Sequence, residues 1–342
     1  MNSFDRFQRE MSGYMQASIL GALAELDFGT VILENGNSMS AAALADRCGC
    51  DRRGTEVLLD ALAAMGYLLK SGTGDKARYA VAEDYTTYLD SRHPSTFIPI
   101  MRHMAGGQRT WARLTWSVKD GKPQEREASI LGAEQDKISF IMGMNSGAIR
   151  LAGSVMNSLR EAGVLTFGAP NPRILDIGGA SGTYTEAFLR EVPGSSATIF
   201  DLPVGIEQAK RRFIGSDMEA RVALIAGDFT QVALPSGFDL AWISAIIHQM
   251  NRGESRMLYA KALAALNPGG TVAVRDYVMS EDRISPVDGA LFGVNMLVNT
   301  PSGMVYTYAE IKDDLEAAGF ANVAHAVDVP SMAAVVTAKK PG

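Results

Sequence analysis

The chain has 342 residues, of which 47% are hydrophobic and 20% are charged, and its formal net charge is −6. This length is enough for two domains with sizeable cores, and the ordinary composition argues against a largely disordered chain. The acidic balance argues against a large surface that neutralises phosphates, so we do not expect nucleic acid as a partner.

The N-terminal segment gives no sign of a targeting signal. It carries charges of both signs and has no apolar core region, and no run of about 18 apolar residues occurs in the sequence. We therefore expect neither a secretory signal nor a membrane span, and we predict a cytoplasmic protein.

The sequence also lacks the pattern of a metal site. Its only cysteines, Cys48 and Cys50, form a lone C-x-C pair without the second pair of ligands that structural zinc requires. The four histidines are scattered, and none forms an HxH or HxxxH pair. We predict two reduced thiols and no bound metal.

Residues 11 to about 70 have the apolar spacing of three short helices. Ser40 and Asp51 stand where the second and third helices would need N-caps. The following residues, 66–83, contain two short β-prone runs around a Ser-Gly-Thr-Gly turn, which predicts a hairpin. Three helices followed by a hairpin predict a winged-helix arrangement.

A winged helix can bind DNA through a recognition helix in the major groove. Here that helix would cover residues 52–65, and its basic residues are only Arg52 and Arg53 at its start. Its outer positions are mostly Ala, Leu and Met, which suit a protein partner better than phosphate. We interpret the module as a dimerisation domain. A non-enzymatic winged-helix regulator with a ligand-sensing α/β domain is the alternative.

Residues 97–118 and 138–162 form two long helical stretches that are unusually rich in methionine and aromatic residues. Packing in a core explains such stripes. The alternative is that the adaptable thioether side chains line an apolar substrate cavity.

From residue 173 the sequence alternates between strands and helices. We predict strands at 173–177, 197–200, 222–226, 238–243 and 271–275, helices at 183–191, 204–214, 253–266 and 308–318, and two final strands within 321–329 and 332–340. This pattern predicts an α/β fold, a Rossmann-like parallel sheet with helices on both faces and an antiparallel pair at its C-terminal end. The predicted domains are 1–100 for dimerisation, 101–165 for linking helices, and 166–342 for the α/β domain.

The first predicted strand ends at Asp176, and a bare turn with Gly178, Gly179 and Gly182 follows. The spacing G-x-A-x-G is one residue shorter than the dinucleotide fingerprint G-x-G-x-x-G, and the nearby carboxylate would repel a phosphate. An acid beside a bare turn suits a ligand with an ammonium group. The turn therefore points to an amino-acid moiety.

The next two strand ends also present acids. Asp201 follows Asp176 by 25 residues, where a carboxylate can accept both hydroxyls of a ribose. Asp228 offers a carboxylate to an amino group on a base edge, and Phe229 offers a ring for stacking. Structural roles remain open for all three, as a turn residue, a cap and a core ring. Taken together, the three strand ends offer contacts for an amino acid, a ribose and an adenine, which are the parts of S-adenosylmethionine.

The stretch from about 173 to 335 resembles class I S-adenosylmethionine methyltransferases through DIGGASG, IFDLP, GDF and the NPGG turn at 267–270. Nearly the whole chain resembles the small-molecule O-methyltransferases typified by the caffeate, isoflavone and acetylserotonin enzymes, as a bacterial-type member. This resemblance implies a homodimer whose N-terminal modules exchange helices and close the partner's substrate pocket. The predicted cofactor-binding residues are Asp176, Gly178, Gly179, Gly182, Asp201, Leu202, Asp228, Phe229 and Ser244. Ser244 stands where plant members have lysine.

The resemblance also implies catalytic roles. His248 falls on the histidine of the family's H-D-W segment, which is the general base for the acceptor hydroxyl, although Gln249 and Met250 replace Asp-Trp. Asp276 matches the first of two acids that flank the base in plant enzymes, while the second aligns near Val305. We predict His248 as base and Asp276 as the residue that orients it. A role of His248 in positioning substrate only is the alternative.

We predict methyl transfer from S-adenosylmethionine to a hydroxyl on a flat, largely apolar small molecule, with S-adenosylhomocysteine as the other product. Transfer to carbon or nitrogen, or use of the sulfonium without transfer, is the alternative. Candidate substrate-binding residues are Phe97, Met101, His103, Trp111, Phe140, Met144, Phe292, Met296 and Asn299. Of these, Met144 and Met296 align with substrate-packing methionines of the family, and His103 is an alternative base or a core histidine.

Overall fold

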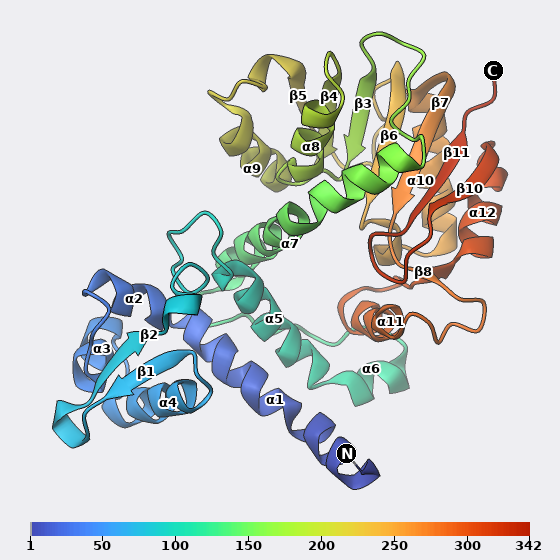
Figure 1. Ribbon diagram of the computed structural model, residues 1–342. Helices are drawn as coiled ribbons and strands as arrows, with labels where there is room; N and C mark the ends of the chain where they lie inside the picture. Colours follow the sequence, from blue (N-terminus) through green and yellow to red (C-terminus); the bar gives the residue numbers. More distant parts are fainter. Residues whose placement is uncertain (1) are drawn as a thin grey trace. The chain divides into compact units, whose positions relative to one another are not determined.

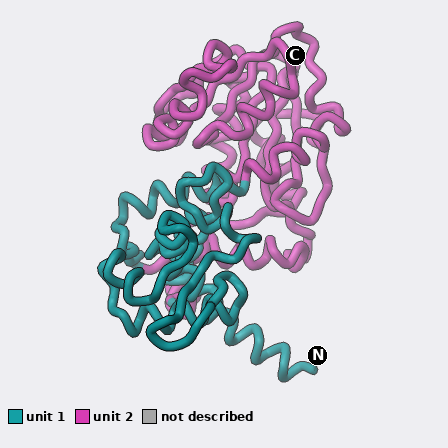
Figure 2. Tube along the Cα trace, turned by 60° about the vertical axis from the view of Figure 1, so that its left-hand side comes forward, with its two compact units in different colours: residues 1–112, 125–147 teal, residues 113–124, 148–342 magenta. Residues whose placement is uncertain are grey.

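The computed structural model describes residues 2–342. The chain forms two compact units, drawn in separate colours in Figure 2: residues 2–112 with 125–147, and residues 113–124 with 148–342. The long helix α7 (Ala133–Glu161) contributes its first half to the first unit and its second half to the second.

The first unit contains the predicted helices and hairpin. Its elements are α1 (Ser3–Glu25), α2 (Phe28–Glu34), α3 (Ala41–Cys48), α4 (Arg52–Ala64), β1 (Leu68–Ser71), η1 (Gly74–Lys76), β2 (Arg78–Val81), η2 (Glu83–Tyr85) and α5 (Ile98–Trp111), shown in Figure 1. Strands β1 and β2 pair antiparallel, which confirms the hairpin. Ser40 and Asp51 are the N-caps of α3 and α4, because each side chain accepts a backbone N–H three residues later.

The number of N-terminal helices was predicted wrongly. The segment read as one helix from residue 11 is α1 and α2, which are separated by Asp27 in the left-handed conformation at φ 55°. The Asp27 carboxylate accepts hydrogen bonds from Thr30 Oγ1 at 2.7 Å and from Ser91 Oγ at 2.8 Å. Ser91 is 64 residues away in the sequence. A contact with a distant loop therefore holds the break, and periodicity does not show it.

The predicted stretch 97–118 is also divided. It contains α5 and a second helix, α6 (Leu114–Asp120), because Arg113 leaves helical geometry at φ −104° and ψ 15°. The stretch 138–162 lies almost entirely within α7.

The second unit contains a seven-stranded sheet in the order β10-β11-β7-β6-β3-β4-β5. Its strands are β3 (Arg173–Ile177), β4 (Ser196–Asp201), β5 (Val222–Ala226), β6 (Phe238–Ser244), β7 (Leu266–Arg275), β10 (Ala321–Val327) and β11 (Val335–Lys339). Strands β3 to β7 are parallel, and β11 and β10 continue the sheet antiparallel. This confirms the predicted Rossmann-like sheet.

The other elements of this unit are α6, the end of α7, α8 (Thr183–Glu191), α9 (Pro203–Phe213), η3 (Glu219–Arg221), η4 (Ile247–Gln249), α10 (Arg252–Ala265), α11 (Val287–Asn299) and α12 (Tyr308–Ala317). Two short strands, β8 (Val278–Met279) and β9 (Tyr306–Thr307), pair parallel outside the main sheet. The helix α11 was not predicted from the sequence.

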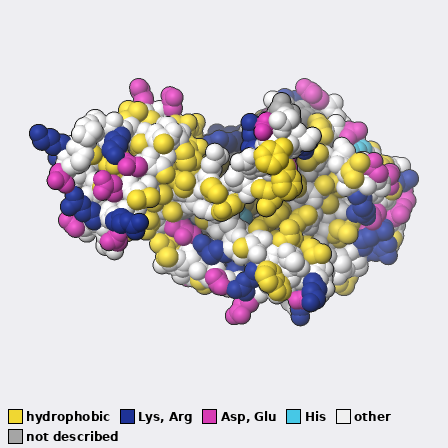
Figure 3. Space-filling model, turned by 90° about the horizontal axis from the view of Figure 1, so that it is seen from below, with side chains coloured by type: hydrophobic (Ala, Val, Ile, Leu, Met, Phe, Trp, Pro, Cys, Tyr) yellow, Lys and Arg dark blue, Asp and Glu magenta, His cyan; other side chains and the backbone are white. Residues whose placement is uncertain are grey.

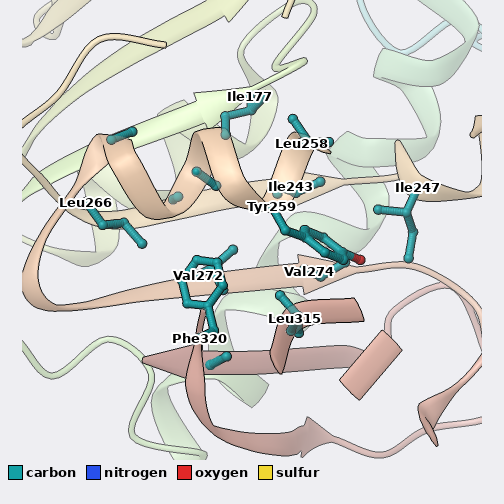
Figure 4. Packing of buried hydrophobic residues seen from close by; sticks show 14 of the residues in the cluster. Ile177, Ile243, Ile247, Leu258, Tyr259, Leu266, Val272, Val274, Leu315 and Phe320 are labelled. Carbon is teal, nitrogen blue, oxygen red and sulfur yellow. The ribbon is translucent and has the colours of Figure 1, made fainter. Parts of the chain in front are cut away.

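Two hydrophobic clusters cover the two faces of the sheet. Leu175 and Ile177 of β3 pack with α10 and α12, and Figure 4 shows Tyr259 of α10 in this cluster. Ile174 of β3 and Trp242 of β6 pack with α7, α8 and α9 on the opposite face. Because side chains alternate along a strand, Asp176 lies on the face that α7 to α9 cover.

Within residues 2–342, no individual helix combines the length and apolar character of a bilayer span. The bent pair of α1 and α2 meets both criteria when its two helices are taken together.

Candidate functional site

The turn between β3 and α8 requires glycine at two positions. Gly178 and Gly182 have positive φ angles of 73° and 78°. A Cβ atom would lie 2.5 Å from Ile246 Cδ1 at the first position and 2.5 Å from the Phe213 ring at the second. The bare turn is therefore needed for packing as well as for access of a ligand to the backbone.

Asp176 lies beneath this turn and is 2% exposed. Its Oδ2 accepts a hydrogen bond from Thr185 Oγ1 at 2.6 Å, and a Cβ on Gly179 would lie 2.7 Å from the carboxylate. Burial raises the pKa of Asp176 to about 7; the hydrogen bond from Thr185 opposes this shift and the charge of Asp201 adds to it. A cation beside this carboxyl group would stabilise its charged form.

Asp201 ties the end of β4 to the same turn. Its Oδ2 accepts the Ala180 N–H at 2.7 Å, and its Oδ1 accepts the N–H of the exposed Leu202 at 2.6 Å. Burial raises the pKa of Asp201, while the two backbone hydrogen bonds lower it. The carboxylate thus has the turn role that the sequence left open, and it keeps lone pairs for a further donor.

Asp228 and Phe229 have structural contacts at the end of β5. Asp228 Oδ1 accepts from the Thr230 backbone N–H at 2.8 Å and from Thr230 Oγ1 at 2.6 Å, and these bonds lower the pKa of Asp228. The Phe229 ring packs against the cluster that contains α10. Asp228 therefore closes a local turn and does not cap a helix, and Phe229 is a partly buried ring at the edge of the core.

Sequence reasoning missed Arg212 at the end of α9. Its guanidinium donates to the Ser181 carbonyl at 2.7 Å, to Thr183 Oγ1 at 3.0 Å and to Glu186 Oε2 at 2.6 Å. Arg212 therefore holds the glycine turn and the first turn of α8 together. No local pattern could have found it, since about 30 residues separate it from the turn.

His248 and Asp276 meet at the ends of β6 and β7. Nδ1 of His248 lies 2.9 Å from both carboxylate oxygens of Asp276, and the Tyr277 N–H donates to Oδ1 at 2.9 Å. His248 is 6% exposed and Asp276 is 1% exposed. The Phe292 ring packs edge-on against the imidazole, with the ring centroids 4.7 Å apart. This geometry orients the imidazole without a second acid, and Val305 is a buried apolar residue.

The candidate substrate residues belong to both units. Met101, His103 and Trp111 lie on α5, with Phe97 just before it, and Phe140 and Met144 lie on the first half of α7; Phe292, Met296 and Asn299 lie on α11 in the second unit. Within the first unit, Met101 packs in the core, and the rings of His103 and Phe140 are 5.0 Å apart. Burial lowers the pKa of His103, and the charge of Arg126 acts in the same direction.

Ser244, at the end of β6, accepts a hydrogen bond from Arg275 Nη1 at 2.9 Å. Arg275, which is buried, is a second arginine that was not recognised from the sequence. In the part of the chain that the structure describes, no group of three or more His, Cys, Asp or Glu side chains could hold a metal ion.

Two protein-family models match the chain and show the family to which it belongs. The model for the O-methyltransferase domain matches residues 114–321, and the model for the O-methyltransferase dimerisation domain matches residues 9–91. The chain belongs to the S-adenosylmethionine-dependent O-methyltransferases. This confirms the family that the sequence motifs indicate.

Individual relatives agree with this O-methyltransferase assignment. The chain is 30% identical to acetylserotonin O-methyltransferase of Gallus gallus over 91% of this chain and 90% of that protein. It is 32% identical to 3-hydroxy-5-methyl-1-naphthoate 3-O-methyltransferase of Streptomyces sahachiroi over 83% and 80%. The chain has the same fold as the crystal structure of human N-acetylserotonin methyltransferase in complex with S-adenosylmethionine. The two align over 100% of both chains, with a TM-score of 0.81 and 23% sequence identity.

The turn predicts a specific stability defect in this O-methyltransferase. We expect Gly182→Ala to lower the free energy of unfolding by about 2–4 kcal/mol, because a left-handed alanine is strained and its methyl group would overlap the Phe213 ring. Gly215 is the matched control: its φ is 73° and no atom lies within 4 Å of an added Cβ, so Gly215→Ala should cost only about 1 kcal/mol. Urea unfolding measures both, and equal losses would contradict the packing argument.

Proposed function

We propose that this O-methyltransferase methylates a hydroxyl group on a flat, largely apolar small molecule, with His248 as the general base. The observation that carries the proposal is the buried pair of His248 and Asp276. A carboxylate at Nδ1 stabilises the tautomer with a proton on that nitrogen, so Nε2 is left to accept a proton. A positioned base of this kind contributes about 10²–10⁴ to a rate.

The cofactor assignment for the individual residues is also a proposal. A buried carboxyl group of raised pKa beneath a glycine turn fits a ligand that brings an ammonium group. We propose that Asp176 takes this group, that Gly178, Gly179 and Gly182 leave room for it, and that Asp201 and Leu202 meet the ribose. Asp228, Phe229 and Ser244 complete the proposed contacts. S-adenosylmethionine, when bound, supplies an electrophilic methyl group on a positively charged sulfur.

Aromatic side chains next to His248 support a flat acceptor. Phe292 contacts the His248 imidazole, and its ring centroid lies 5.3 Å from that of Tyr277. Offset and edge-on aromatic contacts favour flat rings as ligands. The names of two relatives point the same way, since one acts on acetylserotonin and the other on a hydroxynaphthoate. We propose Phe97, Met101, His103, Trp111, Phe140, Met144, Met296 and Asn299 as the remaining substrate contacts.

A homodimer is part of the proposal. Phe4, Phe7, Met11 and Tyr14 recur at helical spacing along α1 and are all strongly exposed. Figure 3 shows exposed hydrophobic side chains gathered on the surface of the molecule. A row of this kind needs an apolar partner, and the match to the dimerisation domain supports a second copy of the chain.

The base is tested by substitution of His248. We expect His248→Ala to lower kcat by about 10²–10⁴ and to leave the affinity for S-adenosylhomocysteine within about twofold. Asp276→Asn should lower kcat by about 10–100-fold, because it removes the charge and puts an amide NH2 donor in place of one of the two accepting oxygens. Transfer of labelled methyl to acetylserotonin and to hydroxynaphthoates measures turnover and shows whether oxygen is the acceptor. If His103→Ala lowered turnover more than His248→Ala did, the base would be His103 and the assignment of His248 would be wrong.

The buried acid predicts how cofactor binding depends on pH. Below pH 7 the Asp176 carboxyl group is mostly protonated, and an ammonium group requires the ionised form. Affinity for S-adenosylhomocysteine should therefore rise as the pH increases from 5.5, by up to about tenfold per unit, and level off above 7, with a proton released on binding. Calorimetry in buffers of different ionisation enthalpy measures both quantities. A flat profile, or the same profile in Asp176→Asn, would reject the role of Asp176.

The α1 row predicts the oligomeric state. Phe7→Glu should shift the protein from dimer towards monomer at low micromolar concentration, because it buries a charge in the proposed interface. Gln16→Glu adds the same charge to an exposed position on the opposite side of α1 and should leave the dimer intact. Sedimentation equilibrium distinguishes the two, and a dimer that is unchanged in Phe7→Glu would remove α1 from the interface.

A further inference from the structure

Arg275 is a buried cation without a protein carboxylate to pair with. It ends β7, is 4% exposed, and donates from Nη1 to Ser244 Oγ at 2.9 Å. Its guanidinium lies 5.0 Å from the centre of the Tyr184 ring. Within residues 2–342, no carboxylate forms an ion pair with it, and its buried Nε has no hydrogen-bond partner. Burial of an arginine in this state is costly unless an anion arrives.

The strand register places Arg275 and Asp176 on one face of the sheet. Asp176 is opposite Trp242, and Ser244, two residues further along β6, is opposite Arg275. Side chains two residues apart on a strand share a face, so the acid and the arginine both point towards α8. The carboxyl ends of β3 and β7, with β6 between them, thus present a buried acid and a buried guanidinium on the same face of the sheet.

Tyr184 packs on the same face of the sheet, against Trp242. It belongs to the first turn of α8, directly after the glycine turn, and its buried hydroxyl has no hydrogen-bond partner. Burial raises the pKa of Tyr184, and the charge of Arg275 lowers it while that of Asp176 raises it. A free hydroxyl donor beside an unpaired guanidinium is a suitable set for a carboxylate.

We propose that Arg275, assisted by Tyr184, binds the carboxylate of the amino-acid moiety of S-adenosylmethionine. This inference rests on the proposed cofactor site at Asp176. An amino-acid moiety carries an ammonium and a carboxylate on one carbon, and Asp176 and Arg275 offer one partner for each. Arg275 reaches the end of the adjacent strand β6, where it donates to Oγ of Ser244, one of the proposed cofactor contacts, at 2.9 Å.

A purely structural stack of Arg275 on Tyr184 is the competing explanation. Three ligands separate the two: S-adenosylhomocysteine, its decarboxylated analogue 5′-deoxy-5′-(3-aminopropylthio)adenosine, and 5′-methylthioadenosine, which lacks the amino-acid part. Arg275→Met keeps the apolar stem and removes the guanidinium. We expect it to weaken S-adenosylhomocysteine binding by about 10–100-fold, the range of a charged hydrogen bond, and to change binding of the other two less than threefold.

Arg173→Met is the matched control. The Arg173 guanidinium also lies over an aromatic ring, that of Phe238 at 4.9 Å, but at the amino end of β3. It should change none of the three affinities. Arg275→Lys is the second variant if Arg275→Met does not fold; it keeps the charge, loses the planar fork, and should weaken only the ligand with a carboxylate, by about tenfold.

Calorimetry with the full-length protein decides the matter. An equal loss for all three ligands, or no loss for S-adenosylhomocysteine, would overturn the role of Arg275. If the unaltered protein bound 5′-methylthioadenosine but gained nothing from the amino-acid part, the proposed site at Asp176 and this inference would both fail. If Asp176→Asn weakened the decarboxylated analogue while Arg275→Met affected no ligand, the site at Asp176 would stand and only the inference would fail.

Discussion

The parallel pairing of β6 with β7 is the constraint on which the candidate site depends. Its register continues to Ser244 opposite Arg275, so the residues that follow each strand emerge at the same edge of the sheet. His248 and Asp276 meet there although 28 residues separate them. Both carboxylate oxygens of Asp276 lie 2.9 Å from His248 Nδ1, and the Phe292 ring packs edge-on against the imidazole. These contacts fix the orientation of the imidazole. The site therefore needs no second acid, which explains how an apolar Val305 is compatible with a histidine base.

The same edge concentrates charges that the folded chain does not neutralise by itself. Asp176 has a raised pKa because it is buried, and Arg275 is buried without a carboxylate partner. Such groups lower the stability of the free protein and are favourable only when a ligand of opposite charge is bound. Arg212 and Asp201 do the opposite work, since their hydrogen bonds hold the glycine turn in place before a ligand arrives. Asp201 combines the two tasks, since it holds the turn and is also a proposed contact for the ribose.

Local features of the sequence were read correctly. The N-caps at Ser40 and Asp51 and the hairpin depend on neighbouring residues, and the sheet follows from short apolar runs that alternate with helical segments along the chain. One error came from a contact across the chain. Asp27 separates α1 from α2 through a hydrogen bond with the distant Ser91. The helix α11 was missed for another reason, because its boundary signals, Pro286 before it and Pro301 after it, were overlooked. The domain boundaries at residues 100 and 165, and a bacterial-type origin, stay predictions.

The sequence by itself determined the family, the glycine turn and the acids at the strand ends. Each of these is written in consecutive residues, because a turn that excludes Cβ atoms and a strand that ends in an acid are local requirements. Only the tertiary structure decided which charges are buried and which are paired. Arg275 has the same side chain as a solvated surface arginine, and it becomes a buried, unpaired cation only because β6 and α8, distant in the chain, place Ser244 and Tyr184 around it.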